Sequence, residues 1–437
     1  MEILRDCLPP SVRRTLNELP ESLDETYERI LREIKKPNRD HARRLLSCLV
    51  AAVRPLRVEE LAEVLAVDYE DEEGIPRLNP NWRWEDQEQA LLTSCSSLVA
   101  IVESGALRVV QFSHFSVKEF LTSARLSTSS GDILRYHIAL EPAHMILAQA
   151  CMSTLLRWDD RVEQNGARNS SPMSRYAAEH WVTHAQYENV SSCLQKAMEY
   201  LFDLDKPYFA AWQQLHNMDT DAPYRSTFHR FTPIRLSTSD AVPLYYAALC
   251  GFQDLVEHLV FKYPELVNAR GGWYVTPLVA ALAGEHFQTA RILRDKGAHP
   301  NVEGNVGTTP LHSAAYYGQL QMVQALVLEY KAGVNVRKDT GETPLHYLSN
   351  DFGSGHNVSP LPNVSRFLIE HGADVNARSM DLSTPLHIAA RDGKIEVVRV
   401  LLEYGASVDA ENRYGATPSQ VASDPDIIKL LSEHGAK

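Results

Sequence analysis

The chain has 437 residues, and 43 Lys and Arg against 56 Asp and Glu give it a formal net charge of −13. This length allows about two to four domains, and a hydrophobic content of 44% excludes a wholly disordered or fibrous chain. The acidic balance argues against a dedicated binder of nucleic acid or of an anionic membrane, because both reward a basic surface.

The cysteine spacing and the apolar segments indicate which bound groups and which cellular compartment to expect. The six cysteines lie dozens of residues apart with no CxxC pair, so the sequence predicts no zinc site, no disulfide framework and no bound cofactor. No segment reaches the roughly 20 apolar residues that cross a bilayer, and the first residues carry no apolar stretch of signal-peptide length. We expect an intracellular protein without a membrane span, in the cytoplasm rather than the nucleus.

Residues 1–126 have the pattern of several helices followed by a hairpin. The predicted elements, in chain order, are helices at 23–34, 41–53 and 57–66, a shorter helix, and strands at 98–102 and 107–112. This order indicates a winged-helix domain. In the helix at 57–66, which could face DNA, Glu59, Glu60 and Glu63 would repel phosphates, so we do not expect nucleic-acid binding.

Residues 127–236 are predicted to be helical. Aromatic side chains gather at 176–181 and 208–212, which fits helices packed against one another. A Ser- and Asn-rich break at 165–171 fits one exposed loop.

A fixed period then begins and runs to the end of the chain. Thr-Pro-Leu starts at residues 276, 309, 343 and 384, with weaker copies at 242 and 417, and successive prolines are 34, 33, 34, 41 and 33 residues apart. The fullest copy, residues 384–410, closely resembles the ankyrin repeat. The sequence therefore predicts a predominantly α-helical protein in which 237–437 form an ankyrin-repeat solenoid of about six repeats.

The recurring residues have physical roles in such a repeat. Each Thr can cap a first helix while the following Pro takes its first position, where a missing N–H costs nothing. Second helices carry one apolar stripe for stacking. Glycines predicted to end these helices in the left-handed conformation are Gly297, Gly333, Gly372, Gly405 and Gly435.

Histidines recur one repeat apart at His312, His346 and His387. An array spaces equivalent positions along its axis rather than gathering them, so we expect hydrogen bonds to the backbone of the next repeat and no catalysis. The 41-residue interval holds an insertion near 349–362, which is either a recognition loop or a damaged repeat, and the sequence favours the damaged repeat.

A stack of repeats presents a concave surface whose fingertips vary while the stacking positions do not. Candidate partner-binding residues lie where the repeat prescribes no residue, and most are of types common in binding hot spots. They are Trp273, Tyr274, Asn305, Tyr316, Tyr317, Lys338, Arg391, Arg413 and Tyr414. Packing between helices is an open alternative for Tyr316 and Tyr317.

The N-terminal part also resembles a known family. The segments LPESLDETYERIL (19–31), RPLRVEELA (54–62), CSSLV (95–99) and FSHFSVKEFL (112–121) are similar to the region after the NTPase core of large fungal NACHT–ankyrin proteins of the STAND type. The same stretch resembles the winged-helix domain named after GPI inositol-deacylase. With the ankyrin array, the resemblance covers nearly the whole chain, and it implies that 127–236 is a connector between switch and sensor.

One departure from that family is decisive for chemistry. No GxxxxGK[ST] phosphate loop occurs, since the only Gly-Lys pair, Gly393-Lys394, is followed by Ile395, so we expect no nucleotide hydrolysis. The resemblance matches His114 to a histidine that contacts nucleotide in related switches. Here it is a relic or half of a site completed by another protein, and a packing or capping role is favoured.

The leading hypothesis is therefore a non-enzymatic scaffold or sensor that binds a partner protein through the ankyrin surface. The alternative is a regulatory fragment of a NACHT-type switch whose NTPase module is missing or supplied in trans. No catalytic pattern stands out in the sequence, so we expect no enzyme.

Overall fold

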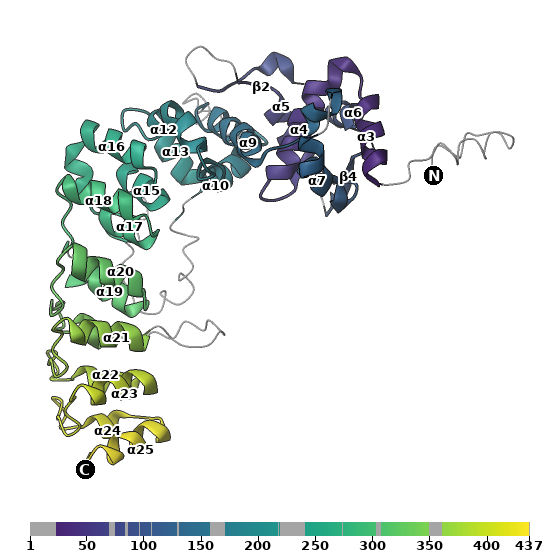
Figure 1. Ribbon diagram of the computed structural model, residues 1–437. Coiled ribbons are helices and arrows are strands. Elements are labelled where there is room, and N and C mark those ends of the chain that lie inside the picture. Colours follow the sequence, from purple (N-terminus) through teal and green to yellow (C-terminus); the bar gives the residue numbers. More distant parts are fainter. Residues whose placement is uncertain are drawn as a thin grey trace. The chain divides into compact units, whose positions relative to one another are not determined.

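The computed structural model describes residues 23–69, 75–83, 86–95, 97–105, 107–128, 131–157, 171–216, 218, 241–272, 274–302, 307–348 and 361–436. Contacts divide the chain into two compact units, Met1–His216 and Asn217–Lys437 (Figure 1). The first unit contains the winged-helix region and most of the predicted connector. The domain limits at 126 and 236 stay predictions.

The first unit begins with a winged-helix arrangement. Its elements are α3 (Leu23–Glu33), η1 (Lys36–Asn38), α4 (Arg39–Ala51), β1 (Leu56–Arg57), α5 (Val58–Leu65), α6 (Gln87–Cys95), β4 (Val99–Ser104), β5 (Leu107–Phe112) and α7 (Phe115–Leu121). Within the described residues β1, β5 and β4 form one antiparallel sheet in that order, with Val99 opposite Phe112 and Ser104 opposite Leu107. A short β2 (Val67–Asp68) and β3 (Arg77–Leu78) ribbon and η2 (Pro80–Trp82) separate α5 from α6.

The acidic side chains of α5 do not behave as the sequence analysis expected. Glu60 is fully buried and accepts hydrogen bonds from the guanidinium groups of Arg54 and Arg57. Glu63 is 4% exposed and pairs with Arg83. The premise that these carboxylates face outward was wrong, because the arginines make their burial favourable.

The element order favours α6 rather than α5 as the helix in the recognition position. In a helix-turn-helix the second helix enters the major groove, and here that helix is α6, directly before the hairpin. Its sequence, QEQALLTSC, contains Glu88 but neither Lys nor Arg. The expectation against DNA binding thus has a better basis in α6 than in α5, because phosphate contacts require cations.

The rest of the first unit is helical. Its elements are α8 (Ala124–Ser127), η3 (Gly131–Tyr136), α9 (Leu140–Leu155), α10 (Ser174–Ala185), α11 (Val190–Cys193), α12 (Gln195–Leu201) and α13 (Tyr208–Leu215). The Trp181 and Trp212 rings meet edge to face at 5.5 Å, and both side chains are buried. Because α9 packs against both α4 and α10, the winged-helix elements and these helices share one core. The predicted packing of the aromatic segments is confirmed.

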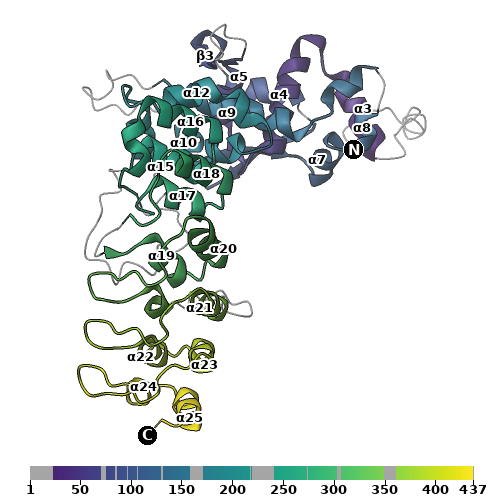
Figure 2. The ribbon, with the colours of Figure 1, turned by 60° about the vertical axis from the view of Figure 1, so that its left-hand side comes forward.

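The second unit is the predicted array. In its described part, six successive helix pairs, here called repeats 1 to 6, stack in chain order (Figures 1 and 2). The pairs are α15 (Pro243–Cys250) with α16 (Gln253–Lys262), α17 (Pro277–Ala283) with α18 (Phe287–Asp295), α19 (Pro310–Tyr316) with α20 (Leu320–Gln324), η10 (Pro344–Tyr347) with α21 (Leu361–Glu370), α22 (Pro385–Arg391) with α23 (Ile395–Glu403), and α24 (Pro418–Val421) with α25 (Pro425–Glu433). Two shorter elements, η7 (Pro264–Asn268) and η9 (Ala325–Glu329), follow α16 and α20.

Helix ends in the array follow the glycine prediction except in repeat 3. Gly297, Gly372, Gly405 and Gly435 adopt positive φ, whereas at the end of repeat 3 Lys331 does so, with φ of 56°, and Gly333 does not. The second helix of repeat 3 carries one extra residue, which the π-helical turn η9 absorbs. That turn shifts the helix end to Lys331, so the prediction for Gly333 was wrong.

Repeat 4 is the least regular copy. Its first helix is reduced to the four-residue 3-10 turn η10, and residues 349–360 lie outside the described residues. Leu361 and Pro362, which the sequence analysis placed in the insertion, form the first turn of α21. Among the described residues, no helix combines the length and the apolar character that crossing a membrane requires.

Candidate protein-binding surface

Histidines link neighbouring repeats along the array. The backbone N–H of Thr343 donates to Nδ1 of His346 at 3.1 Å, and Nε2 of that ring donates to the carbonyl of Ser383 at 3.1 Å. The same pair of bonds joins His312 to Glu342 and His387 to Ala416. Burial lowers the pKa of His312 to about 4, so this ring is neutral at neutral pH. The structural reading of all three histidines is confirmed.

Asparagines form a second set of links, which the sequence analysis missed. Asn335 donates from Nδ2 to the carbonyl of Gly372 at 2.8 Å, and its Oδ1 accepts from the N–H of Asp374 at 2.8 Å. Asn268 bonds Gly297 and His299 in the same way, and Asn376 bonds Gly405 and Ser407. Their recurrence with the period of the repeat was the available signal.

The turns between repeats 3 and 6 are held to one another. We call residues 337–342, 378–383 and 411–416 the fingertips. The N–H of Met380 donates to the carbonyl of Thr340 at 2.9 Å, and the N–H of Arg413 donates to the carbonyl of Asp381 at 2.7 Å. These bonds join each fingertip to the next and fix the backbone that carries the exposed side chains.

Three large apolar side chains project from these fingertips. Met380 is 65% exposed, Leu382 42% and Tyr414 82%. Leu382 has a φ of 61°, at the place where neighbouring fingertips have Gly341 and Gly415. A leucine in this conformation is strained, so an exposed leucine here is unfavourable for folding alone. Tyr414 was predicted as a binding residue, whereas Met380 and Leu382 were missed.

The structure brings three other predicted residues together around Tyr347. The ring of Tyr316 lies 5.4 Å from that of Tyr347 and 5.2 Å from that of Tyr317. Nζ of Lys338 lies 4.4 Å from the centroid of the Tyr347 ring and also contacts Glu342. Burial opposes the charge of Lys338, but its hydrogen bond to Glu342 raises its pKa overall. These half-buried side chains contact one another, as the packing alternative expected for the two tyrosines.

The remaining candidates are dispersed. Tyr274 is half-buried, and its backbone N–H donates to Oη of Tyr245 at 3.2 Å. Arg391 is exposed and pairs with Asp392 at 2.9 Å, which raises the pKa of the arginine. Arg413 is exposed and donates to the carbonyl of Met380 at 3.1 Å. Trp273 and Asn305 lie outside the described residues. Partner binding by any of these candidates stays a prediction.

His114 caps a helix in the first unit. Its Nδ1 accepts from the N–H of Ser116 at the start of α7, and Oγ of Ser116 lies 2.7 Å from Oη of Tyr27. The capping role is confirmed, while a nucleotide-sensing role stays a prediction. Across the ranges that the structure describes, no three His, Cys, Asp or Glu side chains gather as metal ligands.

Two family patterns match the chain. The pattern described as "GPI inositol-deacylase, winged helix domain" matches residues 27–131, and "Ankyrin repeats (3 copies)" matches residues 244–338, 279–379 and 359–437. The chain thus combines a winged-helix domain of this type with ankyrin repeats. Ankyrin repeats indicate a role in protein–protein interaction.

Several curated proteins share part of the sequence. The azaphilone pigments biosynthesis cluster protein L of Monascus ruber is 30% identical over 296 residues, which cover 65% of this chain and 61% of that protein. Ankyrin repeat and SOCS box protein 16 of Homo sapiens is 37% identical over 110 residues, covering 25% of this chain and 24% of that protein. A putative ankyrin repeat protein of fowlpox virus is 35% identical over 108 residues, covering 24% and 31%. The chain therefore spans about three fifths of the fungal relative and a third or less of the other two.

Proposed function

We propose that the chain is a non-enzymatic scaffold or sensor that binds a partner protein through the fingertips of repeats 3 to 6. The observation that carries this proposal is the exposed trio Met380, Leu382 and Tyr414 on a backbone held by bonds between fingertips. Exposed apolar side chains on a rigid surface bind at a low entropic cost, because little has to be ordered on association. Tyr is also among the residues most often found in binding hot spots.

The strained backbone at Leu382 supports the same surface. A residue in the left-handed conformation costs on the order of 1 kcal/mol or more, and glycine would avoid this cost. The leucine side chain is 42% exposed, so its burial in the fold does not offset the strain fully. Burial against a partner would offset it.

The proposal is tested by capturing partners with the full chain and titrating the recovered protein against purified variants. Tyr414→Ala and Met380→Ala should each weaken binding by about tenfold or more, as expected for hot-spot residues. Phe261→Ala is the matched control, because Phe261 on α16 is 90% exposed but lies outside the fingertips. Equal affinities for the control and both fingertip variants would contradict the proposal.

A second candidate function follows from the winged-helix domain. Phe115, next to His114 at the start of α7, is 70% exposed, which offers the first unit an apolar contact of its own. Supported by this surface, the alternative is that the unit docks on a NACHT NTPase module in trans and regulates it. The full chain should then bind such a module from the same cell, nucleotide should change the affinity, and Phe115→Ala should weaken it. An affinity that neither nucleotide nor Phe115→Ala changes would contradict this alternative.

A further inference from the structure

Both sets of links between repeats are interrupted at the same place, the joint between repeats 2 and 3. Val279 occupies the position at which His312, His346 and His387 bond the following repeat. At the equivalent position of repeat 1, the phenol of Tyr245 accepts a hydrogen bond from the backbone of Tyr274. A valine side chain can do neither, so repeat 2 lacks this link to repeat 3.

The asparagine link is missing there as well. Asn301 occupies the position of Asn268, Asn335 and Asn376, but among the described residues it makes no hydrogen bond to repeat 3. The linking asparagines bond the backbone at the end of the next repeat's second helix, so the partner of Asn301 would be the end of the second helix of repeat 3. The π-helical turn η9 has displaced that end and placed Lys331 where repeats 2, 4, 5 and 6 have glycine.

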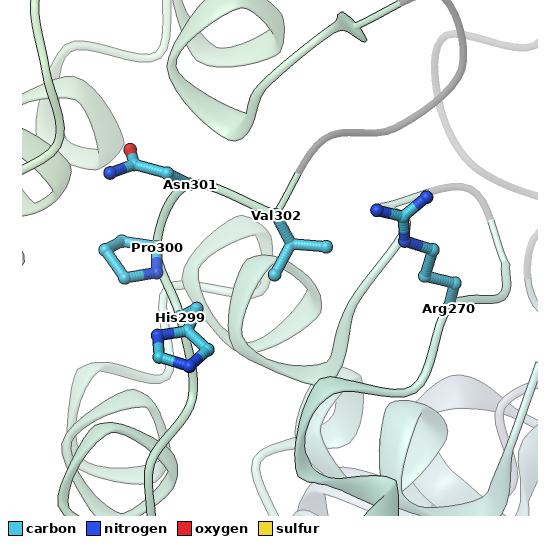
Figure 3. Close-up of a pocket in the computed structure, with 5 residues that line it drawn as sticks. All are labelled: Arg270, His299, Pro300, Asn301 and Val302. Carbon is cyan, nitrogen blue, oxygen red and sulfur yellow. The ribbon is translucent and has the colours of Figure 1, made fainter.

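The packing of the first helices agrees with the missing bonds. Among the described first helices, α17 and α19 make less contact than any other pair of neighbours. An open cavity of about 400 Å³ lies on the repeat 2 side of this joint, between the turns before and after repeat 2 (Figure 3). Arg270 borders it on one side, and residues 299–302 border it on the other.

The second helices keep two weak contacts across the joint. The guanidinium of Arg294 lies 5.7 Å from the centroid of the Tyr330 ring, and Arg291 approaches Glu329 at 3.9 Å with both side chains about half exposed. An exposed ion pair of this kind contributes little to stability. The joint therefore keeps contacts between its second helices but lacks both the histidine link and the asparagine link among the described residues.

We infer that the array consists of two blocks, repeats 1–2 and repeats 3–6, and that the interface between α17 and α18 on one side and α19 and α20 on the other acts as a hinge. In a repeat array each repeat is stabilised by its interfaces with its neighbours, so the array should bend most easily at the interface that lacks both links. The hinge lets the curvature of the binding surface change without disturbing the fingertips of repeats 3 to 6.

Pulsed EPR distance measurements on the full chain test the hinge. Spin labels are placed on cysteines at two pairs of exposed positions, each two repeats apart near the starts of second helices, in a chain with Cys7 and Cys193 changed to Ser. The pair Asp254→Cys and Gln321→Cys crosses the joint, and the pair Asn363→Cys and Asp426→Cys lies within repeats 4 to 6. The distance distribution across the joint should be at least about twofold wider than the other.

Reciprocal substitutions provide the matched control. Val279→His restores the missing ring opposite the carbonyl of Thr308 and should narrow the distribution across the joint. His346→Val removes the same link from an intact joint and should widen the other distribution. Equal widths in the parent chain would overturn the hinge, as would a folded Val279→His chain with an unchanged distribution. If the Val279→His chain does not fold, the test is His346→Val alone. A distance distribution within repeats 4 to 6 that does not widen in this variant would then overturn the proposal.

Discussion

The two units are stabilised by contacts of different reach along the sequence. In the first unit Arg57 bonds the carbonyl of Pro172 and Glu63 bonds Ser171, across separations of 115 and 108 residues. In the array the linking histidines bond backbone only 29 to 37 residues ahead. Loss of one contact should therefore affect the whole core of the first unit but only adjacent repeats in the array.

The largest effect is expected from removing the buried carboxylate of α5. Burial alone would raise the pKa of Glu60, but hydrogen bonds from Arg54 and Arg57 lower it, which shows how well the charge is compensated. Glu60→Ala leaves two arginines without their partner and should cost the first unit about 3 kcal/mol or more. Denaturant unfolding with hydrogen exchange should show the loss throughout the first unit and none in the array. The control Glu59→Ala, at a carboxylate exposed on the surface, should change stability by less than about 0.5 kcal/mol.

Low pH should destabilise the first unit through a buried histidine. His184 is fully buried beside Tyr176 and His144, and burial lowers its pKa from 6.5 to about 3. The unfolded chain therefore binds more protons between these pH values, so stability is complete above about pH 6.5 and falls as the pH drops towards 3. By pH 4 the loss from this residue should be about 3 kcal/mol.

The measurement is the free energy of unfolding against pH for the parent chain and for His184→Asn. The difference between the two should shrink as the pH falls, because the variant cannot be protonated at this site. A constant difference from pH 7 to pH 4 would contradict a buried neutral His184.

Removing one histidine link from the array should cost less stability than Glu60→Ala, and only in the adjacent repeats. His387→Val removes the bond to the carbonyl of Ala416 and leaves that acceptor and the Thr384 N–H to find other partners, at a cost of about 1–3 kcal/mol. Hydrogen exchange should rise in repeats 5 and 6 only. Increased exchange in repeats 1 and 2 would contradict this expectation, because it would make the array one cooperative unit.

The smallest effect on stability is expected from Leu382→Gly, which should change stability and partner binding in opposite directions. Leu382→Gly relieves the strained backbone and should stabilise the array by up to about 1 kcal/mol, since glycine adopts positive φ without penalty. The same change removes an exposed apolar side chain and should weaken partner binding. A melting temperature that falls while affinity is unchanged would contradict both the strain and the proposed surface.

Most features of the array follow from the amino-acid sequence alone. A fixed period places Pro at the first helical position of every copy and the full Thr-Pro-Leu-His pattern in repeats 3 to 5. A contact inferred for one of these repeats therefore applies to the next, and the histidine bonds and helix starts were predicted correctly. The prediction of the left-handed residue failed in repeat 3, because one extra residue in its second helix moved this position from Gly333 to Lys331.

The burial of charges and the absence of links between repeats became clear only in the folded molecule. Glu60 and Glu63 have the sequence pattern of a solvated helix face, and it is the approach of Arg54, Arg57 and Arg83 that makes their burial favourable. The interrupted joint follows from Val279 and Asn301 together, each of which is unremarkable within its own repeat. The physical reason is common to both cases: a hydrogen bond needs its second partner in place, and the fold determines where that partner lies.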